Sequence, residues 1–258
     1  MLDLITSTKN PLVQRFKSLQ TRRGREVENA FLVEGEKLIR EALFAGLVPG
    51  VALVEQGRAE ALAALVSMAE ADGAQMYPVA RHVLEAACDT QTPSGICCMF
   101  APPVALDLAH PPARLVALDG IQDPGNAGTI WRTADAAGFE GMLFGGGSAD
   151  ALSPKVVRGA MGSSFRVPAT QVVLADTLAA LRMQGYDVVI TSLSGDDIYA
   201  RVPMGERFVL VIGSEARGVS AAVDALATVR VKLPMRGGAE SLNAAVAAGI
   251  VMYELTRT

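Results

Sequence analysis

Residues Leu233–Leu255, LPMRGGAESLNAAVAAGIVMYEL, join a glycine-rich loop to a helix whose first turns are almost entirely Ala and Gly. A helix that only filled a core would carry more Leu and Ile in these turns. Ser241 and Asn243 stand where the helix begins, and both residue types are favoured at helix N-termini. The small side chains therefore indicate that another group approaches this end of the helix closely.

The quoted stretch closes a segment in which apolar runs alternate with helical patterns. Short, fully apolar strands between helices predict an α/β domain with a mostly parallel sheet that is covered on both faces. Ligands of such sheets bind beyond the carboxyl ends of the strands. The predicted strands are residues 114–119, 141–146, 186–192, 207–213 and 229–234, and the predicted helices are residues 128–138, 176–185 and 220–226, with a last helix in the quoted stretch.

Two Pro-Pro pairs mark a break in the pattern and predict a linker over residues 102–113. We therefore expect a small domain at residues 1–101 and a larger one at residues 114–258. The small domain also mixes helix and strand patterns, which favours a small α/β sandwich. Its helical apolar positions are Leu38, Ile39, Leu43 and Phe44, its expected strands are residues 50–55 and 95–100, and a second helix is expected over residues 59–73.

The composition is that of a globular protein, because half of the 258 residues are hydrophobic and 19% are charged. A formal net charge of −4 argues against bulk attraction to nucleic acid, so any such contact requires a local basic patch. One window without Asp or Glu offers a patch that could bind RNA phosphates. Its basic residues are Lys9, Arg15, Lys17, Arg22, Arg23 and Arg25.

The cysteine and histidine counts exclude two common kinds of site. Cys88, Cys97 and Cys98 form no even disulfide framework and no C-x-x-C pair, and the chain has two histidines, so we expect no metal site. The N-terminus lacks the apolar core of a signal peptide, and no segment is long and apolar enough to span a bilayer. We expect a soluble, cytoplasmic protein.

Three predicted strand ends lead into polar, glycine-rich loops: residues 120–138, 213–220 and 235–243. Taken singly, their polar residues have ordinary interpretations. Asn126, or Thr129, would cap a helix, and the other side chains would be solvated. Their expected position at one edge of one sheet favours a shared site instead. The sequence has no G-x-G-x-x-G, no P-loop and no G-x-S-x-G, so dinucleotide enzymes, P-loop enzymes and serine hydrolases fit poorly.

Together and in this order, the loops resemble the three motifs of the SpoU (TrmH-like) RNA 2′-O-ribose methyltransferases of the SPOUT superfamily. The segment SPKVVRGAMGSSFRVP (153–168) looks like the one that this family carries between its first two motifs. Residues 5–43 and 92–100 resemble the L30e-like substrate-binding domain that precedes many members. The three motifs read DPGNAGTIWRTADAAG (123–138), VLVIGSEARGVS (209–220) and VKLPMRGGAESLNAAVAAGI (231–250).

The resemblance implies that the C-terminal domain is a deep trefoil knot, which forms the pocket for S-adenosylmethionine, and that two copies form a homodimer through it. Small residues in the last helix would admit the cofactor and the partner. The residues that match cofactor-binding positions are Gly213, Leu233, Leu242, Thr191, Ser192, Ser241 and Asn243. Those that match the catalytic set are Arg132, Asn126, Glu215, Ser241 and Asn243.

The implied reaction is attack of a ribose 2′-hydroxyl on the methyl group of a sulfonium, which needs positioning of the reactants and no metal. The family mechanism makes Arg132 the base. Because a guanidinium group stays protonated up to a pH of about 12, we favour Arg132 as a residue that positions and stabilises the developing alkoxide. The N-terminal domain favours ribosomal RNA, most plausibly 23S, as substrate. The open alternatives are a tRNA 2′-O-methyltransferase, a base methyltransferase and a non-catalytic RNA-binding assembly factor.

Overall fold

The structure, a computed structural model, describes residues 3–200 and 204–257. The chain forms two compact units. Unit 1 comprises Met1–Pro103 together with Leu152–Phe165, and unit 2 comprises Val104–Ala151 and Arg166–Thr258. The sequence pattern assigned Leu152–Phe165 to the C-terminal domain, whereas in the structure this stretch packs with unit 1. We call it the excursion, since the chain leaves unit 2 at its start and returns at its end.

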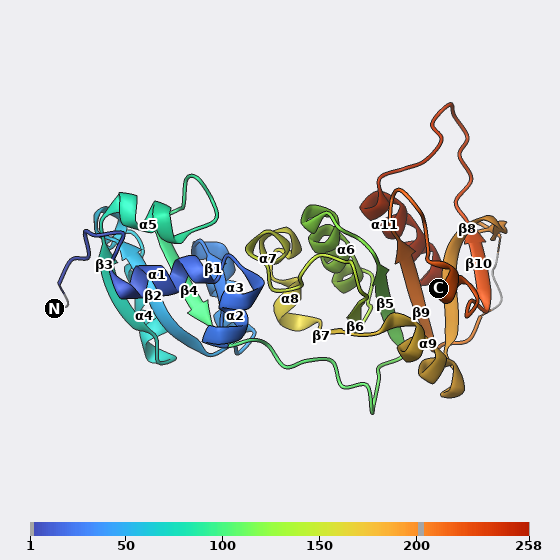
Figure 1. The fold of residues 1–258 in the computed structure, drawn as a ribbon, viewed down its shortest axis with the longest axis horizontal. Coiled ribbons are helices and arrows are strands. Elements are labelled where there is room, and N and C mark those ends of the chain that lie inside the picture. Colours follow the sequence, from blue (N-terminus) through green and yellow to red (C-terminus); the bar gives the residue numbers. More distant parts are fainter. Residues whose placement is uncertain (1–2, 201–203, 258) are drawn as a thin grey trace. The chain divides into compact units, whose positions relative to one another are not determined.

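Unit 1 is built on a four-stranded sheet in the order β1-β4-β2-β3 (Figure 1). Strand β4 is antiparallel to both of its neighbours, and β3 is parallel to β2. The strands are β1 (Phe31–Glu34), β2 (Pro49–Glu55), β3 (Gln75–Val79) and β4 (Ile96–Phe100).

Helices cover both faces of this sheet, because successive strand residues point to opposite sides. Phe31 and Val33 face α3, α4 and the excursion, whereas Leu32 faces α1 and α5. The small α/β sandwich expected from the sequence is thus present. The helices are α1 (Pro11–Ser18), α2 (Arg22–Glu28), α3 (Glu36–Phe44), η1 (Gln56–Arg58), α4 (Ala63–Ala71) and α5 (Arg81–Ala87), with α7 (Pro154–Ala160) and most of α8 (Ser163–Arg166) in the excursion.

One residue of the predicted apolar face of α3 lies outside the core. Leu38, Ile39 and Leu43 are buried as expected, but the side chain of Phe44 is 73% exposed. Phe44 is the last residue of the helix and follows directly on Leu43. Adjacent helical residues point about 100° apart, so burial of Leu43 turns Phe44 toward solvent.

The three cysteines are free thiols buried in unit 1. Burial raises the pKa of Cys97 and the pKa of Cys98, because a thiolate would lose its solvation there. Both thiols therefore stay protonated at neutral pH and pack as small apolar groups.

Unit 2 contains a six-stranded sheet in the order β10-β8-β9-β5-β6-β7, and each pairing within its described strands is parallel. This confirms the prediction of a mostly parallel sheet. The trefoil knot stays a prediction. The strands are β5 (Arg114–Asp119), β6 (Gly141–Phe144), β7 (Ala169–Gln171), β8 (Asp187–Asp197), β9 (Phe208–Gly213) and β10 (Val229–Lys232).

Two helix pairs complete the layers of unit 2. Helices α9 (Leu174–Met183) and α10 (Ala221–Asp224) cover one face of the sheet. Helices α6 (Pro124–Ala136) and α11 (Ala244–Leu255) pack against each other, and the aromatic rings of Trp131 and Phe144 join α6 to β6. None of the helices in residues 3–200 and 204–257 is long and apolar enough to cross a membrane.

The small residues of α11 face α6. Ala244, Ala245 and Ala248 are buried, and a methyl group added at Gly249 would lie 3.4 Å from Cγ2 of Thr133 on α6. The close approach predicted for this end of the helix is therefore present, and the approaching element is another helix of the same unit. In Figure 1 the chain between β10 and α11 swings out from the sheet before it returns to α11.

Most of the predicted linker, from Val104 on, belongs to unit 2 and is anchored there. Leu106 is buried in the core of this unit, and its backbone N–H donates to the carbonyl of Ala169 at 3.3 Å. The hydroxyl of Tyr186 lies 2.7 and 2.8 Å from the carbonyl oxygens of Pro111 and Pro112, which share its one hydrogen. The Pro-Pro pairs break regular structure as predicted, but these residues are anchored.

Candidate functional site

The candidate site lies where the order of the strands reverses. From β5 the chain builds outward through β6 and β7, and it then returns to add β9 and β8 on the other side of β5. Asp119 at the end of β5 is paired in register with Gly213 at the end of β9. The loops that follow these two strands therefore leave the sheet side by side, at the kind of edge where α/β sheets bind ligands.

The loop after β9 is a tight turn closed by backbone hydrogen bonds. Ser214 and Gly218 exchange N–H···O bonds of 3.0 and 2.8 Å, and Gly218 has a φ of +65°. A side chain at Gly213 would collide with the backbone of Gly218, so this position admits only glycine. Glu215 lies within the turn. The cofactor role predicted for Gly213 stays a prediction, and the turn alone explains its identity.

Asp119 closes this loop onto β5 and was missed in the sequence. Its Oδ2 accepts the backbone N–H of Ser220 at 2.6 Å. Ser148 performs a similar task from the loop after β6, since its hydroxyl accepts from the N–H of Gly120 and donates to the carbonyl of Leu118, both at 3.0 Å. Short polar residues at or soon after the ends of apolar strands are the signal that could have identified both.

Helix α6 begins at Pro124 with Asp123 as its N-cap, whose Oδ1 accepts the backbone N–H of Asn126 at 2.7 Å. The prediction that Asn126 or Thr129 caps this helix is therefore wrong. Asp precedes Pro at the first helical position, which is the preferred arrangement of a helix start. Because Asp123 caps the helix, the amide of Asn126 is available for other partners.

Asn126, Glu215 and Asn243 form a hydrogen-bonded chain, which we call the three-loop cluster. The Asn126 Nδ2 donates to Oε1 of Glu215, and the Asn243 Nδ2 donates to Oδ1 of Asn126 at 3.0 Å. Oδ1 of Asn243 also accepts the N–H groups of Ala245 and Val246, which caps α11. Three of the five residues predicted as catalytic thus meet, one from each loop.

The other two residues of the predicted catalytic set stand apart from the cluster. Arg132 is exposed on α6, six residues after Asn126, which turns it about 240° around the helix from Asn126. Neither Arg132 nor the side chain of Ser241 makes a hydrogen bond or ion pair within the described part of the chain. Within that part, no group of three His, Cys, Asp or Glu side chains is placed to hold a metal ion.

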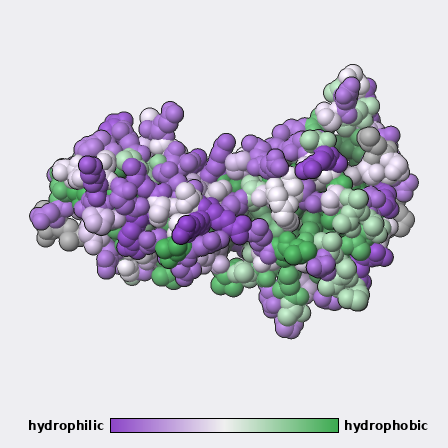
Figure 2. All heavy atoms as spheres, in the orientation of Figure 1, coloured by the Kyte–Doolittle hydropathy of each residue, from purple (hydrophilic) through white to green (hydrophobic). Residues whose placement is uncertain are grey.

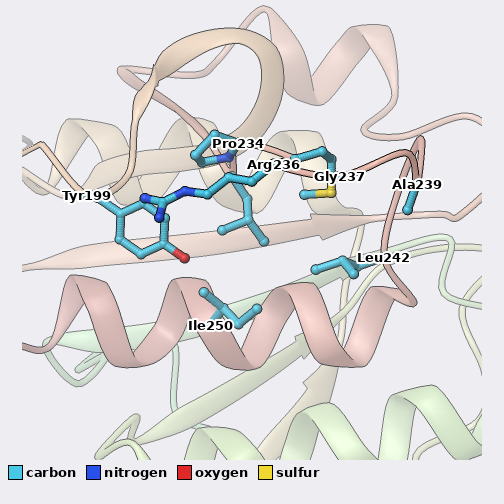
Figure 3. A pocket seen from close by; sticks show the side chains of 9 residues that line it. Tyr199, Pro234, Arg236, Gly237, Ala239, Leu242 and Ile250 are labelled. Carbon is cyan, nitrogen blue, oxygen red and sulfur yellow. The ribbon is translucent and has the colours of Figure 1, made fainter.

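A pocket of about 570 Å³ opens beside the cluster (Figure 3). It includes Leu233 and Leu242, two of the predicted cofactor residues, and Leu242 directly precedes Asn243 of the cluster. Figure 3 shows Ile250 pointing into it from α11, and Arg236 reaching over the ring of Tyr199, with 5.7 Å between the guanidinium carbon and the ring centroid. The lining residues are Tyr199, Leu233, Pro234, Met235, Arg236, Gly237, Ala239, Leu242 and Ile250.

The pocket suits an organic ligand with a flat, apolar part and an anionic group. Its volume falls within the range of about 300–1,000 Å³ typical of small-molecule sites. Leu233, Leu242 and Ile250 supply apolar contact, Tyr199 an aromatic face, and Arg236 a cation that can pair with a carboxylate. Tyr199 and Ile250 were missed because they are far in sequence from the loops and come near only in the fold.

Thr191 and Ser192, also predicted near the cofactor, do not line this pocket. They lie in a bulge of β8, where the pairing with β10 shifts from Ile190 to Asp196. Within the bulge, the hydroxyls of Ser192 and Ser194 are 3.1 Å apart. A bulge exposes side chains and backbone that a regular strand would pair, so a cofactor role for these residues stays a prediction.

The basic window at the N-terminus has three kinds of residue. Arg25 is only 6% exposed, and its guanidinium donates to the carbonyl of Leu19 at 2.6 Å, so it serves the fold. Arg15 and Arg22 are exposed and pair with glutamates on α2, each at 2.9 Å. Lys9, Lys17 and Arg23 are exposed and have no polar side-chain partner in the described residues. Hydrophilic residues predominate on the face of unit 1 seen in Figure 2.

Two protein-family models match this chain. The model of the SpoU rRNA Methylase family matches residues 113–253. The model of the MRM3-like substrate binding domain matches residues 10–98.

Known relatives match over nearly the whole length. The 23S rRNA (guanosine(2553)-2′-O)-methyltransferase RlmP of Bacillus subtilis is 37% identical, over 97% of this chain and 98% of the relative. An AdoMet-bound rRNA methyltransferase from Sinorhizobium meliloti has a similar structure, with a TM-score of 0.86, 32% identity, and coverage of 99% and 98% of the two chains. The SpoU methyltransferase AviRb of Streptomyces viridochromogenes, in complex with AdoMet, has a TM-score of 0.83, 31% identity, and coverage of 96% and 98%.

The three-loop cluster predicts a specific pattern of stability. Asn126→Asp places a carboxylate against Glu215 and should cost about 1 kcal/mol of folding free energy, because a donor is replaced by a like charge. Adding Glu215→Gln restores a donor opposite the new carboxylate, so the double variant should recover most of the loss. Urea unfolding followed by the fluorescence of Trp131, which is buried in unit 2, measures both.

The matched control is Gln122→Glu, which adds the same charge at an exposed position of the same loop. It should leave the stability nearly unchanged. A double variant that loses the sum of the two single losses would show that Asn126 and Glu215 are not coupled.

Proposed function

The chain belongs to the SpoU rRNA methylase family, and on that premise we propose that it methylates the 2′-hydroxyl of a nucleotide in 23S ribosomal RNA. S-adenosylmethionine is the methyl donor and RNA the acceptor. The three-loop cluster is the observation that supports a working enzyme, because a protein that only bound RNA would not need Asn126, Glu215 and Asn243 to meet beside a pocket. The name of the full-length Bacillus relative supports 23S RNA as the substrate.

The residues of the pocket fit S-adenosylmethionine. Leu233, Leu242 and Ile250 would hold the adenosine part, and Arg236 would pair with the carboxylate of the methionine part. When bound, the cofactor supplies a methyl group on a positively charged sulfur, which is an activated leaving group. Because Leu242 and Asn243 are neighbours in the chain, a ligand in the pocket would lie next to the three-loop cluster.

The three-loop cluster is suited to orient the ribose. The amide nitrogen of Asn126 has two hydrogens, and Glu215 accepts one of them, so the second remains for a ribose oxygen. Glu215 and Asn243 fix the amide on both sides and keep that second hydrogen in one direction. Ser241, two residues before Asn243, would add a hydroxyl to the same site.

We assign Arg132 to the reacting oxygen because it matches the family motif, although within one chain it stands apart from the three-loop cluster. Its guanidinium has no partner in the described chain and is therefore available to the RNA. The 2′-oxygen forms a bond to the methyl carbon as the bond from carbon to sulfur breaks, and the hydroxyl proton leaves. A guanidinium remains protonated at neutral pH, so Arg132 would stabilise the developing negative charge, and Glu215 is the carboxylate at the site that can accept the proton.

The first experiment is transfer of labelled methyl from S-adenosylmethionine to unmodified total RNA, followed by alkaline hydrolysis. Label in hydrolysis-resistant dinucleotides from 23S RNA is the expected result. Arg132→Ala should lower kcat by about 100-fold or more, the scale of losing one charge-stabilising group, and the Kd for S-adenosylmethionine should change by less than about twofold, since Arg132 does not line the pocket.

Arg182→Ala, which removes an exposed arginine from α9, is the control and should behave like the wild type. Near-normal activity of Arg132→Ala would refute its role. Label in tRNA, or in ordinary mononucleotides, would identify a tRNA enzyme or a base methyltransferase. Absence of both label and cofactor binding would identify an assembly factor.

We infer that RNA binds unit 1 through the free basic residues of its N-terminal segment. Lys9, Lys17 and Arg23 are exposed and unpaired in the described structure, and phosphate contacts of this kind dominate RNA affinity. The match to a substrate-binding domain over residues 10–98 supports this location. Arg15 and Arg22 would first have to leave their glutamates, and buried Arg25 is left out of the surface.

Replacing Lys9, Lys17 and Arg23 together by Gln should weaken RNA binding and reduce the slope of log K against log salt by roughly 2–3, because three counterion-releasing contacts are lost. Filter binding at several salt concentrations gives the slope. The control carries Gln at Lys37, Arg58 and Arg81 of the same unit. Equal effects of the two triple variants would contradict a localised surface.

We also infer that two copies associate through α11. Val246 and Tyr253 lie two helical turns apart on the side away from the buried alanines, and they are 53% and 56% exposed. An exposed apolar stripe on a helix is a common feature of protein interfaces. A second copy would present the same stripe, which makes the contact self-complementary.

Val246→Asp should convert a dimer to a monomer, since it places a charge in the apolar interface. Sedimentation velocity measures the change. Met183→Asp, which alters an exposed apolar residue on α9 (85% exposed), should leave the dimer intact. A wild-type chain that remains monomeric at all concentrations would refute the dimer.

A further inference from the structure

The cation and the aromatic ring that line the pocket of unit 2 contact each other. The guanidinium carbon of Arg236 lies 5.7 Å from the ring centroid of Tyr199, and Figure 3 shows the side chain of Arg236 reaching over that ring. This distance is close to the limit of about 6 Å for a cation–π contact, and both residues are exposed, so the contact is weak. The ring face that meets Arg236 is nevertheless not open to a ligand.

Tyr199 is fixed in place by the backbone around it. Its N–H donates to Oδ1 of Asp197 at 3.0 Å, and the N–H of the buried Ile198 donates to the carbonyl of Lys232 at 2.9 Å. Lys232 is the last residue of β10 and directly precedes Leu233 of the pocket. The segment after β8 therefore holds the ring beside the loop that leads to α11.

Arg236 lies in a part of that loop with few restraints. The backbone of residues 233–242 forms no hydrogen bond among the described residues. A methyl group added at Gly237 or at Gly238 would meet nothing within 4 Å. Segments with few backbone hydrogen bonds and open surroundings rearrange at low free-energy cost. Arg236 can therefore exchange one partner for another while Tyr199 stays in place.

The open side of the pocket is apolar and suits a flat base. Tyr199, Met235 and Leu242 line it and are 43%, 36% and 39% exposed. Tyr199 is the one aromatic residue among the described lining residues. Stacking on an aromatic side chain is a strong interaction that every base can make. A base in this pocket and the guanidinium of Arg236 thus have the same ring as a partner.

We propose that Arg236 makes the pocket selective for adenosine derivatives that carry a carboxylate. When the ligand has no carboxylate, Arg236 stays on the ring of Tyr199 and competes with the base. A carboxylate draws the guanidinium away, because a charge-assisted hydrogen bond is stronger than an exposed cation–π contact. The ring is then free to stack on the base. The inference rests on the proposed function for the identity of the cofactor, and it adds how the pocket rejects other nucleosides.

Calorimetric titration of the full chain with two ligands tests this exchange. S-adenosylhomocysteine carries the carboxylate and has no methyl group to transfer, whereas 5′-methylthioadenosine lacks the amino-acid part. Arg236→Ala should bind 5′-methylthioadenosine about two- to fivefold more tightly, because the ring is released from the cation. It should bind S-adenosylhomocysteine about fivefold more weakly, because the lost charge pair outweighs that release. A merely damaged pocket would weaken both ligands.

Variants of Tyr199 show whether the ring is the shared partner. Tyr199→Ala should weaken both ligands by about five- to tenfold, the scale of losing one stacked base. Tyr199→Phe keeps the ring and should leave both Kd values within about twofold. In the Tyr199→Ala background, Arg236→Ala should no longer tighten 5′-methylthioadenosine, because no ring remains to be released. This double-mutant cycle measures the coupling between the two residues.

Arg217→Ala is the control, because it removes an exposed arginine that lies in the loop after β9 and does not line the pocket. It should change neither Kd. Unchanged or weaker binding of 5′-methylthioadenosine by Arg236→Ala would overturn the proposal, as would a tightening that persists without the ring. A wild type that binds neither ligand would refute the cofactor and this inference together. Normal methyl transfer with shifts of the same sign would refute this inference alone.

Discussion

The side-chain amide of Asn126 holds together the loops at the candidate site of unit 2. It accepts from Asn243 and donates to Glu215, and so it joins three loops that are far apart in sequence. An amide is suited to this position because it offers a donor and an acceptor at once, whereas an ionised carboxylate would have no donor for Glu215. The parallel sheet brings the loops together, and this one side chain sets their mutual positions.

Helix α11 must satisfy three demands with one short sequence. Its alanines and Gly249 allow α6 to approach, Ile250 closes the pocket, and Val246 and Tyr253 remain exposed. Close packing of two helices requires small residues where the helices touch. The absence of large side chains from its first turns is therefore explained within unit 2 itself, before a cofactor or a second copy is considered.

The sequence predicted those features that follow from local pattern and failed where long-range packing decides. Five of the six strands of unit 2 and its main helices were predicted because apolar runs and helical spacing report burial directly, whereas the three-residue strand β7 was not predicted. Taken singly, Asn126 has the chemistry of a helix cap, but Asp123 stands in the better position before Pro124 and caps the helix. The sequence places Arg25 in a basic patch, but in the structure it is buried and its guanidinium donates to the carbonyl of Leu19, the C-cap of α1. The periodicity of the sequence does not reveal this contact.

The same limit applies to the site. The motif loops identified Leu233 and Leu242 because those residues lie within them, whereas Tyr199 reaches the pocket from the segment after β8. The attachment of Leu152–Phe165 to unit 1 could not be predicted either. Its apolar residues fit a core, but nothing in their spacing says which core.

The path of the excursion also constrains how the protein is made. During synthesis the N-terminal residues leave the ribosome first, and domains generally begin to fold as they emerge. The sheet of unit 1 is complete once β4 has been made, but its core lacks Val157 and Phe165 until β5, α6 and β6 have followed. The apolar side chains of β1 therefore stay partly exposed to solvent until this later segment has been translated. Unit 1 can therefore be completed only after the first two strands and the first helix of unit 2 have been made.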